Sequence, residues 1–550
     1  MTNDTTGRDA VLDSAHLGDI RGALGTIRQG DVAPRNRVSM RLKTLLAIIG
    51  PGLIVMVGDN DAGAFGTYTQ AGQNYGTRLL WTLLLLIPVI YVNQEMVLRL
   101  GAVTGVGHAR LILERYGRFW GAFSVIDLFI LNALTIVTEF IGISLGLTYL
   151  GLPKVPGVIA AALVIIASVS TGSFRRFERV SLILVAGSLT LIPIFLLVHP
   201  PMGQVARDFL VPGMPAGSQM STVMLLIIAI VGTTVAPWQL FFQQSYIIDK
   251  RITPRFIPYE RVDLWLGIVF VVVGAVAMMA FSAAAFAGTP GHGNYTDALG
   301  IAEGLAASAG HWAGILFAIA LIDASIIGAA AVGLSTSYAM GDVLGLHHSL
   351  HRRPSEAKAF YAIFAGLLLV SAVIVIIPGS PLGLLTEGVQ TLAGVLLPSA
   401  TVFLLLLCND RGVLGPWVNR RAMNLFAGAV IAVLVMLSTI LTASVLFPQI
   451  TSSQILVILA VGTALSLAAG AYLAWSGRHP KDATPAASTE PPEAPERAQD
   501  RATWRMPPIA MLTRPTLSAG NRTGLTVLRG YLLVASALVV VKVVQLALGH

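Results

Sequence analysis

Long apolar segments alternate with short polar loops along most of the chain. Each segment has about 20 residues, which is the length at which a helix crosses a hydrocarbon core of about 30 Å. The pattern predicts an all-α polytopic membrane protein with a transporter core of about twelve spans over residues 44–475. The apolar segments lie at 44–68, 78–98, 121–150, 156–172, 179–198, 219–248, 262–288, 312–339, 358–377, 383–408, 422–447 and 453–475.

Polar segments flank this core. Residues 1–43 form a soluble arm that ends in a basic stretch and lacks the short apolar stretch and cleavage site of a signal peptide. Residues 477–523 are rich in Pro, Ala and Glu and predict a disordered linker. A last apolar run at 525–549 predicts an additional transmembrane helix.

Composition and charge narrow the class of protein. Only 12% of the residues are charged, about half the usual share in a water-soluble domain, so the solvent is lipid. The net charge of +8 comes from short loops on one side, whereas the loops on the other side contain only Arg78, Lys154 and Arg207. This asymmetry predicts a plasma-membrane protein with a cytosolic N-terminus rather than a nucleic-acid-binding protein. A single cysteine, Cys408, excludes an intrachain disulfide framework.

Two spans are not expected to be ordinary, continuous helices. The first contains Gly58 to Gly66 (GDNDAGAFG), and the sixth contains Gly232 to Gln239 (GTTVAPWQ), with Pro237 near its middle. A proline inside a helix removes one backbone hydrogen bond, and irregular backbone at membrane depth is tolerated only where protein or a water-filled cavity surrounds it. Broken helices at equivalent places of two five-span halves predict the binding site of an inverted-repeat transporter.

Asp61 is the strongest candidate ligand, since an ionisable residue in mid-membrane normally marks an ion or substrate pathway. Asp59 is either a second ligand or a vestibule charge that attracts cations. Asn60 either offers an amide oxygen or satisfies unwound backbone, and the second interpretation is favoured.

Four further polar residues lie within apolar runs. The hydroxyl of Thr233 is a ligand or bonds its own helix, and Gln390 is a ligand or an interhelical hydrogen-bonding group. Glu139 and Asp323 are carboxylates that pair structurally, relay protons, or raise the local negative potential. The histidines of the loop 347–351 have metal-like spacing, but the neighbouring arginines favour a solvated basic loop.

Three separated motifs resemble those of the Nramp divalent-metal transporters. Gly50-Pro51-Gly52 opens the first span as it does in that family, and the stretch GTTVAPWQLFF is similar to the family's sixth-span signature G-A-T-V-M-P-H-N-L-Y-L-H. The tenth span matches in spacing from Gln390 to Arg411. The resemblance runs from about residue 44 to 447. It implies a LeuT-like fold of two inverted five-helix repeats, with two or three extra C-terminal helices, and metal bound between the first and sixth spans.

The chain also departs from the family pattern at the first span. The family motif D-P-G-N is here Asp61, Ala62, Gly63 and Ala64. The aspartate ligand and the glycine that allows gating are therefore kept, and the asparagine ligand is lost.

In the sixth span, the methionine whose sulfur coordinates transition metals in the family is replaced by Ala236. Two histidines linked to proton movement are replaced by Trp238 and Gln243. The acidic third-span positions of the proton pathway fall on Phe129 and Ile136, although Glu139 matches a family glutamate.

These losses favour a hard, hydrated ion. A thioether prefers softer metals, whereas Mg²⁺ is usually held by one or two carboxylates with several waters retained. The sequence therefore favours the Nramp-related magnesium transporters, with Mn²⁺ as a further substrate and without obligatory proton coupling. A dication gains roughly 4.6 kcal/mol across about 100 mV, so uptake requires no proton.

Alternative functions have their own signatures. A proton-coupled Mn²⁺ or Fe²⁺ symporter of the same family would use Asp323, Glu139 or Asp59 for protons. A Na⁺-driven carrier of organic solutes predicts free N–H groups, not an acidic residue, at the first break. An enzyme is disfavoured because the chain has no nucleophile with a base at helical spacing. The divalent ion is then a transported substrate, and neither a cofactor nor a protein partner is expected.

Overall fold

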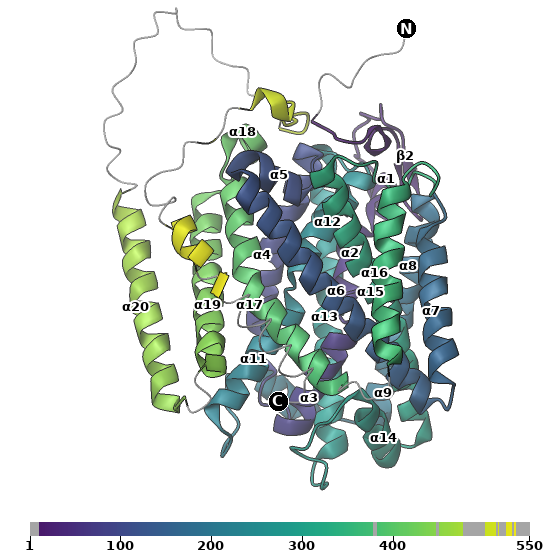
Figure 1. Cartoon of the computed structure of the whole chain (residues 1–550), viewed down its shortest axis with the longest axis vertical. Helices are drawn as coiled ribbons and strands as arrows, with labels where there is room; N and C mark the ends of the chain where they lie inside the picture. The colour runs from purple at the N-terminus through teal and green to yellow at the C-terminus, as the bar shows by residue number, and fades with distance from the viewer. Residues whose placement is uncertain are drawn as a thin grey trace, which may run out of the picture.

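The computed structural model describes residues 10–377, 382–446, 450–476, 501–512, 515, 524–530 and 533–534. It is a bundle of helices that run roughly along one long axis (Figure 1). The N-terminal arm and residues 501–512 lie at one end, here called the arm face, and α14 lies at the other end, here called the α14 face. The predicted all-α polytopic class is confirmed.

Helices occupy all twelve apolar segments of the predicted core. The two interrupted spans are α2 (Pro51–Val57) with α3 (Ala62–Tyr75), and α11 (Met220–Thr234) with α12 (Pro237–Asp249). The other spans are α4 (Trp81–Thr104), α6 (Arg118–Tyr149), α7 (Lys154–Val169), α8 (Phe174–Gly187) with η3 (Ser188–Thr190) and α9 (Leu191–Val198), α13 (Ile257–Phe286), α15 (His311–Leu344), α16 (Lys358–Ile376), α17 (Leu382–Cys408), α19 (Arg421–Leu446) and α20 (Ser452–Ser476).

Shorter elements connect these spans. They are η2 (Ser14–His16), β1 (Ile20–Arg21), β2 (Thr26–Ile27), α1 (Val38–Ile48), α5 (His108–Tyr116), α10 (Met202–Leu210), η4 (Pro254–Phe256), α14 (Ala298–Ala309), α18 (Arg411–Leu414), η5 (Gly415–Trp417) and η6 (Ile509–Met511). By length and composition, eight helices of the described chain could cross a membrane, or up to ten if each bent pair is one span. The number of twelve spans therefore stays a prediction.

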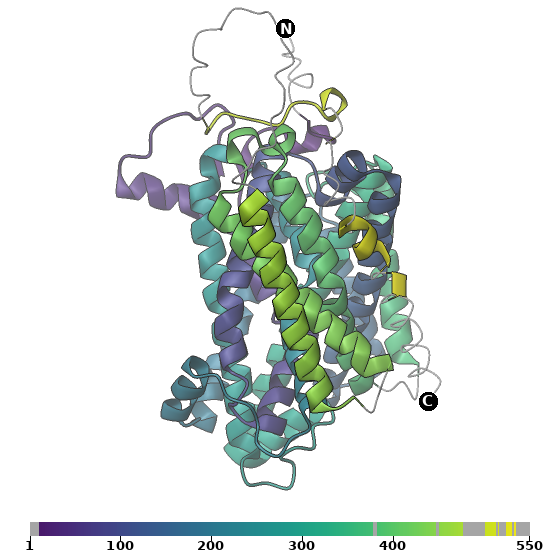
Figure 2. The same cartoon turned by 90° about the vertical axis from the view of Figure 1, so that its left-hand side faces the viewer.

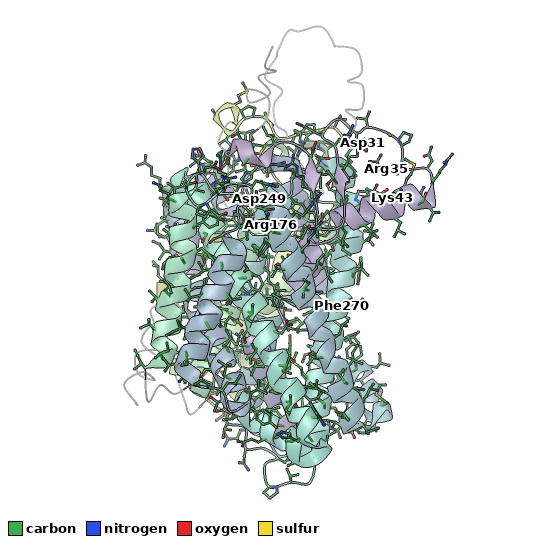
Figure 3. The ribbon with its side chains drawn as sticks, turned by 90° about the vertical axis from the view of Figure 1, so that its right-hand side faces the viewer. Asp31, Arg35, Lys43, Arg176, Asp249 and Phe270 are labelled. Atoms are coloured by element: carbon green, nitrogen blue, oxygen red, sulfur yellow. The ribbon has the colours of Figure 1, made fainter. Side chains whose placement is uncertain are left out.

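The first apolar segment is divided differently from the expectation. The helices α1 and α2 meet at a bend of 50°, so its first part is a bent pair of helices rather than one straight helix. Figure 2 shows α1 projecting sideways from the arm face, and Figure 3 places Lys43 on it, far above Phe270 in the middle of α13. The α1 helix leaves Val38 and Leu42 exposed while Ile48 is buried, which suits a helix at the membrane surface.

The arm is folded onto the bundle rather than free in solution. β1 and β2 form a two-stranded antiparallel hairpin in which Ile20 pairs with Ile27. Glu178 of α8 accepts a hydrogen bond from the backbone of Ala23 and forms a fully buried ion pair with Lys250, at 2.6 Å. The Lys250 ammonium also donates to the carbonyl of Ile48 at 2.5 Å, so the arm, the fifth span and the sixth span meet at one charged centre.

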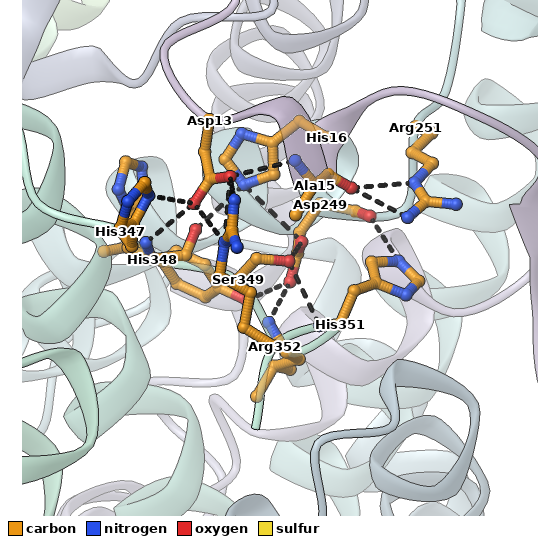
Figure 4. Close-up of polar contacts among 12 residues, drawn as sticks. Asp13, Ala15, His16, Asp249, Arg251, His347, His348, Ser349, His351 and Arg352 are labelled. Atoms are coloured by element: carbon orange, nitrogen blue, oxygen red, sulfur yellow. Dashed lines mark hydrogen bonds and ion pairs between the residues drawn. The ribbon is translucent and has the colours of Figure 1, made fainter. Parts of the chain in front are cut away.

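A second set of contacts fixes the start of the arm (Figure 4). Asp13 accepts hydrogen bonds from the Arg352 guanidinium at 2.6 Å and from the backbone of His348 at 3.0 Å. His16 lies 3.5 Å from Asp249 at the end of α12. Arg251 donates to the carbonyl of Ala15 at 2.8 Å.

The interpretation of the histidine loop as solvated is wrong for His348. Its side chain is buried, and its Nε2 lies 3.0 Å from Asp342. His351 bonds the carbonyl of Asp249 at 3.0 Å, whereas His347 is exposed. The local sequence looked basic and solvated because one acidic partner, Asp13, comes from the N-terminal arm, while Asp342 lies on the last turn of the preceding helix α15.

The expected disorder of 477–523 does not hold for its described part. Residues 477–500 lie outside the described residues, but Met506 is 1% exposed and its backbone N–H bonds the carbonyl of Val103 at 3.2 Å. The Arg501 guanidinium stacks over Trp417, 4.0 Å from the ring centroid. Apolar and aromatic residues thus fix this stretch on the arm face. Of the predicted helix at 525–549, all but 525–530 and 533–534 lies outside the described residues.

Candidate metal site

The first interruption presents Asp61 at the start of α3. The helix α2 ends at Val57, and Gly58 to Asp61 connect it to α3. Asp61 adopts an extended backbone and caps α3, since its Oδ1 accepts the N–H of Ala64 at 2.9 Å. The sequence favours this break because aspartate is a good N-cap. Ala64 stands at the position of the lost asparagine ligand, and its backbone N–H is the donor in this cap.

Asp61 forms a pair with Glu139 of α6. Glu139 Oε2 accepts the N–H of Ala62, the residue after Asp61, at 3.2 Å, and Glu139 Oε1 has no hydrogen-bond partner among the described residues. Gly328 of α15 lets the two side chains approach, because a Cβ there would lie 2.8 Å from the Glu139 carboxyl and 3.0 Å from Asp61 Cβ. Two ionised carboxylates buried side by side repel each other, so a proton or a bound cation would lower the cost of burying both.

Asp59 links the two interruptions. Its Oδ1 accepts a hydrogen bond from the Gln239 amide of α12, and Gln239 in turn accepts one from Gln94 of α4 at 3.0 Å. The Asp59 side chain is buried and its Oδ2 has no partner among the described residues. Asn60 turns instead toward α13, where its amide donates to the carbonyl of Val271 at 3.2 Å. The Asn60 amide oxygen has no hydrogen-bond partner among the described residues, so its role at the break stays a prediction.

The second interruption separates α11 from α12. Ala236 lies within it, and Thr233 lies in the last turn of α11. Pro237 is the first residue of α12, where its missing N–H costs no helical hydrogen bond. Thr234 bonds its own helix at 2.5 Å and the Tyr68 hydroxyl at 2.7 Å. The buried hydroxyl of Thr233 has no such partner in the described chain.

Trp238 and Gln390 close the space around the breaks. The Trp238 indole reaches to 3.8 Å from where a Cβ on Gly58 would lie. The Gln390 amide lies against Gly63, where even a methyl group would overlap it. Glycine at residue 63 therefore allows α17 to touch the start of α3.

Two predicted residues lie apart from this group. Asp323 is half-buried against Gly187 of the fifth span, and it lies five residues from Gly328, which is about 140° around the helix. Asp323 thus does not face the Asp61–Glu139 pair. Gln243 is fully buried in α12, and neither end of its amide finds a hydrogen-bond partner among the described residues.

The sequence did not identify Gln239 and Gln94 as part of the site. Both side chains are amides within apolar helices, and this polarity was the only sign in the sequence that they could belong to the site. Within the described part of the chain, no three His, Cys, Asp or Glu side chains are grouped so that they could hold a metal. A cation at the breaks would therefore depend on one or two carboxylates, neutral oxygens and water.

Comparison with known proteins gives consistent results. The family model described as natural resistance-associated macrophage protein-like (Nramp) matches residues 52–444. The divalent metal cation transporter MntH of Ralstonia nicotianae is 30% identical over 412 residues, covering 71% of this chain and 89% of that protein. The MntH of Deinococcus radiodurans is 27% identical over 432 residues, covering 75% and 91%.

Solved structures show the same fold. The Eremococcus coleocola manganese transporter in complex with an aromatic bis-isothiourea substituted compound superposes with a TM-score of 0.63 at 20% identity, covering 82% of this chain and 97% of that one. The H236A mutant of that transporter gives the same TM-score and identity.

Proposed function

Because the chain belongs to the Nramp family of divalent metal cation transporters, we propose that its two helix breaks bind a hard divalent cation, Mn²⁺ or Mg²⁺. Asp61 supplies the charge that holds the ion. Thr233, Gln390, the free oxygen of Asp59 and freed backbone carbonyls supply neutral or additional oxygen ligands, and water completes the shell.

The observation that carries this proposal is the chemistry of the side chains at the breaks. Ala236 occupies the place of the family's sulfur ligand, and the donors around Asp61 are oxygens. Oxygen donors suit Mg²⁺ and Mn²⁺, whereas removing a thioether weakens the preference for softer ions such as Cd²⁺.

The names of the relatives favour manganese. They are called MntH or manganese transporters, and this supports the Mn²⁺ alternative better than the Mg²⁺ preference expected from the sequence. We therefore propose Mn²⁺ as a transported ion, with Mg²⁺ admitted by the loss of the sulfur ligand.

Proton coupling is a second candidate property, favoured by the buried Glu139 carboxyl beside Asp61. A dication that binds Asp61 favours the charged form of Glu139, so a proton held by Glu139 would leave as the ion binds. Transport without coupling instead releases this proton to the side from which the ion came, and the membrane potential alone moves the ion.

Orientation follows from the distribution of positive charge. The arm face carries the basic loops, since Arg175, Arg251 and Arg352 all bond residues of the N-terminal arm, so we place it on the cytosolic side of the plasma membrane. The ion then enters from the α14 face and leaves through the arm face by alternating access.

Transport in proteoliposomes tests these proposals. The wild type should take up Mn²⁺ and Mg²⁺ in a saturable manner, and Asp61→Ala should abolish both fluxes while Glu303→Gln, an exposed change on α14, leaves them intact. Near-normal uptake by Asp61→Ala would refute the site. A pH-sensitive dye inside the vesicles decides coupling, since coupled transport acidifies the lumen and Glu139→Gln then transports the ion without acidification.

A substitution at residue 236 tests ion selectivity. Ala236→Met should restore a soft ligand and make Cd²⁺ a better competitor of Mn²⁺ uptake, with Ala229→Met in α11, before the break, as a control. Unchanged competition by Cd²⁺ would mean that the missing sulfur does not determine selectivity.

A further inference from the structure

The helix α1 leaves the bundle at the height where the spans end. It points sideways, across the long axis of the bundle (Figure 2). Figure 3 places Lys43 of α1 at about the height of Asp249, the last residue of α12, and of Arg176 near the beginning of α8. In a membrane, the ends of the spans lie where the hydrocarbon core meets the headgroups. The helix α1 therefore runs along that boundary, at the arm face.

One side of α1 is apolar and uncovered. Val38, Leu42 and Leu46 follow one another at intervals of four residues, so they form a single stripe along the helix. Their side chains are 81%, 54% and 37% exposed. In water such a stripe would be costly, because it leaves apolar surface in contact with solvent.

The opposite side of α1 is covered by the N-terminal arm. Thr44 lies about 160° around the helix from Leu46, and it accepts a hydrogen bond from the Arg35 guanidinium at 2.9 Å. Ala47 is buried against the β1–β2 hairpin, where a Cβ on Gly25 would lie 2.9 Å from its side chain. Because the polar arm covers this side of the helix, the apolar stripe is turned toward the hydrocarbon.

Positive charges border the apolar stripe. Arg41 lies about 60° around the helix from Val38, and Lys43 lies about 60° beyond Leu46 on the other side. Arg37 precedes the first turn. All three side chains are exposed, and none takes part in an ion pair within the described part of the chain. Unpaired positive charges beside an apolar stripe match a negatively charged surface with hydrocarbon beneath it.

We propose that α1 is a membrane-docking surface that binds the anionic headgroups of phospholipids in the leaflet at the arm face. The apolar stripe enters the outer part of the hydrocarbon, while Arg41 and Lys43 extend to the headgroup phosphates. The inference depends on the chain spanning a membrane and not on which ion it carries.

The bound lipid would also hold the start of α2. At the end of α1, the carbonyls of Ile48 and Ile49 accept hydrogen bonds from the Lys250 ammonium, at 2.5 and 2.9 Å. The same ammonium pairs with Glu178. Lipid bound to α1 is thereby connected to the charged centre from which α2 leads to the first helix break.

A fluorescent probe on the stripe tests the proposal with the full-length protein in lipid nanodiscs. The probe is attached to Val38→Cys, and the wild type is the labelling control because its single cysteine, Cys408, is 0% exposed. Lipids with a quencher at the top of the acyl chain should quench the probe. Quenching should increase when phosphatidylglycerol replaces part of the phosphatidylcholine, and salt should reduce this increase by screening the charges.

Arg41→Gln combined with Lys43→Gln removes the charge next to the stripe. Each basic residue near an anionic surface strengthens binding, so the fraction of phosphatidylglycerol needed for half of the quenching should rise at least about twofold. Arg21→Gln combined with Arg28→Gln is the matched control, because it removes the same charge from exposed positions of the arm outside α1. This control should give the titration of the labelled parent.

Three results would overturn the proposal. Equal quenching with and without phosphatidylglycerol, or equal titrations for the two double variants, would exclude recognition of anionic lipid. Absence of quenching in every mixture would show that α1 does not lie on the membrane. A probe signal that changes with the number of protein copies per nanodisc would assign the stripe to a second copy of the chain.

Leu42→Asp checks the apolar stripe separately from the charges. The side chain is exposed, so Tm in detergent should stay close to that of the labelled parent while quenching by the lipid falls. Unchanged quenching in this variant would contradict insertion of the stripe into the hydrocarbon.

Discussion

The carboxyl groups of Asp61 and Glu139 are covered on both faces of the bundle. The contacts that cover them on the arm face differ in kind from those on the α14 face. On the arm face, buried charges join three parts of the chain, as in the Lys250–Glu178 pair at 2.6 Å. On the α14 face, the covering loop is held by neutral bonds such as that from Gln73 to Gly291, and a pocket leads toward Asp61. Breaking a buried ion pair costs far more than breaking a neutral hydrogen bond. The described conformation is therefore sealed more firmly on the arm face, and opening it requires rearranged ion pairs.

The largest expected effect comes from Lys250→Met. Glu178 would then be buried without its cation, and the bonds to the Ile48 and Ile49 carbonyls would also be lost. We expect a loss of about 3–5 kcal/mol in the free energy of unfolding, seen as a large drop in Tm of the detergent-solubilised protein. Lys358→Met removes an exposed lysine as a control. An equal, small drop in both variants would contradict the special role of the buried pair.

Asp13→Asn should loosen the attachment of the N-terminal arm, with a smaller loss of stability than Lys250→Met. The Asp13 carboxylate is 1% exposed and accepts the Arg352 guanidinium. Burial opposes the charge, yet these hydrogen bonds and nearby His16 hold the pKa of Asp13 below its usual range. Losing a charged hydrogen bond costs roughly 1.5–3 kcal/mol, so limited proteolysis should cleave the arm faster.

Asp19→Asn, on the same arm but with a side chain that is 36% exposed, is the control for this change. Cleavage at the wild-type rate in Asp13→Asn would show that the Asp13 contacts do not hold the arm.

Alkaline pH should weaken the same attachment. Burial lowers the pKa of His348, but the facing carboxylates Asp342 and Asp13 outweigh it and raise the pKa to about 9; His16 and Tyr338 are the other titratable neighbours. A raised pKa means that the protonated form stabilises the fold below the ordinary pKa of histidine and that this contribution is lost as pH rises through about 9.

Hydrogen exchange of residues 10–27, corrected for the intrinsic rate, measures this loss. Exchange should accelerate progressively between pH 6.5 and about 9 and should level off above that. His348→Gln should remove the pH dependence, and an unchanged acceleration in that variant would assign it to another group.

The smallest expected effect is that of Gln73→Leu on the α14 face. It removes a neutral hydrogen bond worth about 1 kcal/mol, so Tm should change little while exchange in the loop 288–297 becomes faster. A loss of stability as large as that of Lys250→Met would remove the distinction between the two faces.

Much of the site could be predicted from the sequence. Asp61, the glycines around it and Pro237 lie within short motifs, and the structure interrupts the first helix at 58–61 and the sixth at 235–236, within the predicted stretches. Local rules suffice here, because helix breaking and N-capping depend on residues a few positions apart.

Other parts of the site could not be predicted in this way. The hydrogen bond between Asp59 and Gln239 joins residues 180 positions apart, and the sequence left the role of Asp59 open. Asp323 and Glu139 look alike as isolated carboxylates in apolar runs, yet only Glu139 faces Asp61 in the structure. Which side of a helix meets which neighbour depends on packing across the whole bundle.

By itself the sequence determined the class of the protein, because apolar runs long enough to cross a bilayer leave no soluble alternative. It also determined where the chain departs from regular helix, since glycine, proline and aspartate act on their own backbone. Only the tertiary structure decided which buried charges meet, such as Asp13 with Arg352 and Lys250 with Glu178. The energy of a buried charge depends on its partner, and that partner comes from a distant part of the chain.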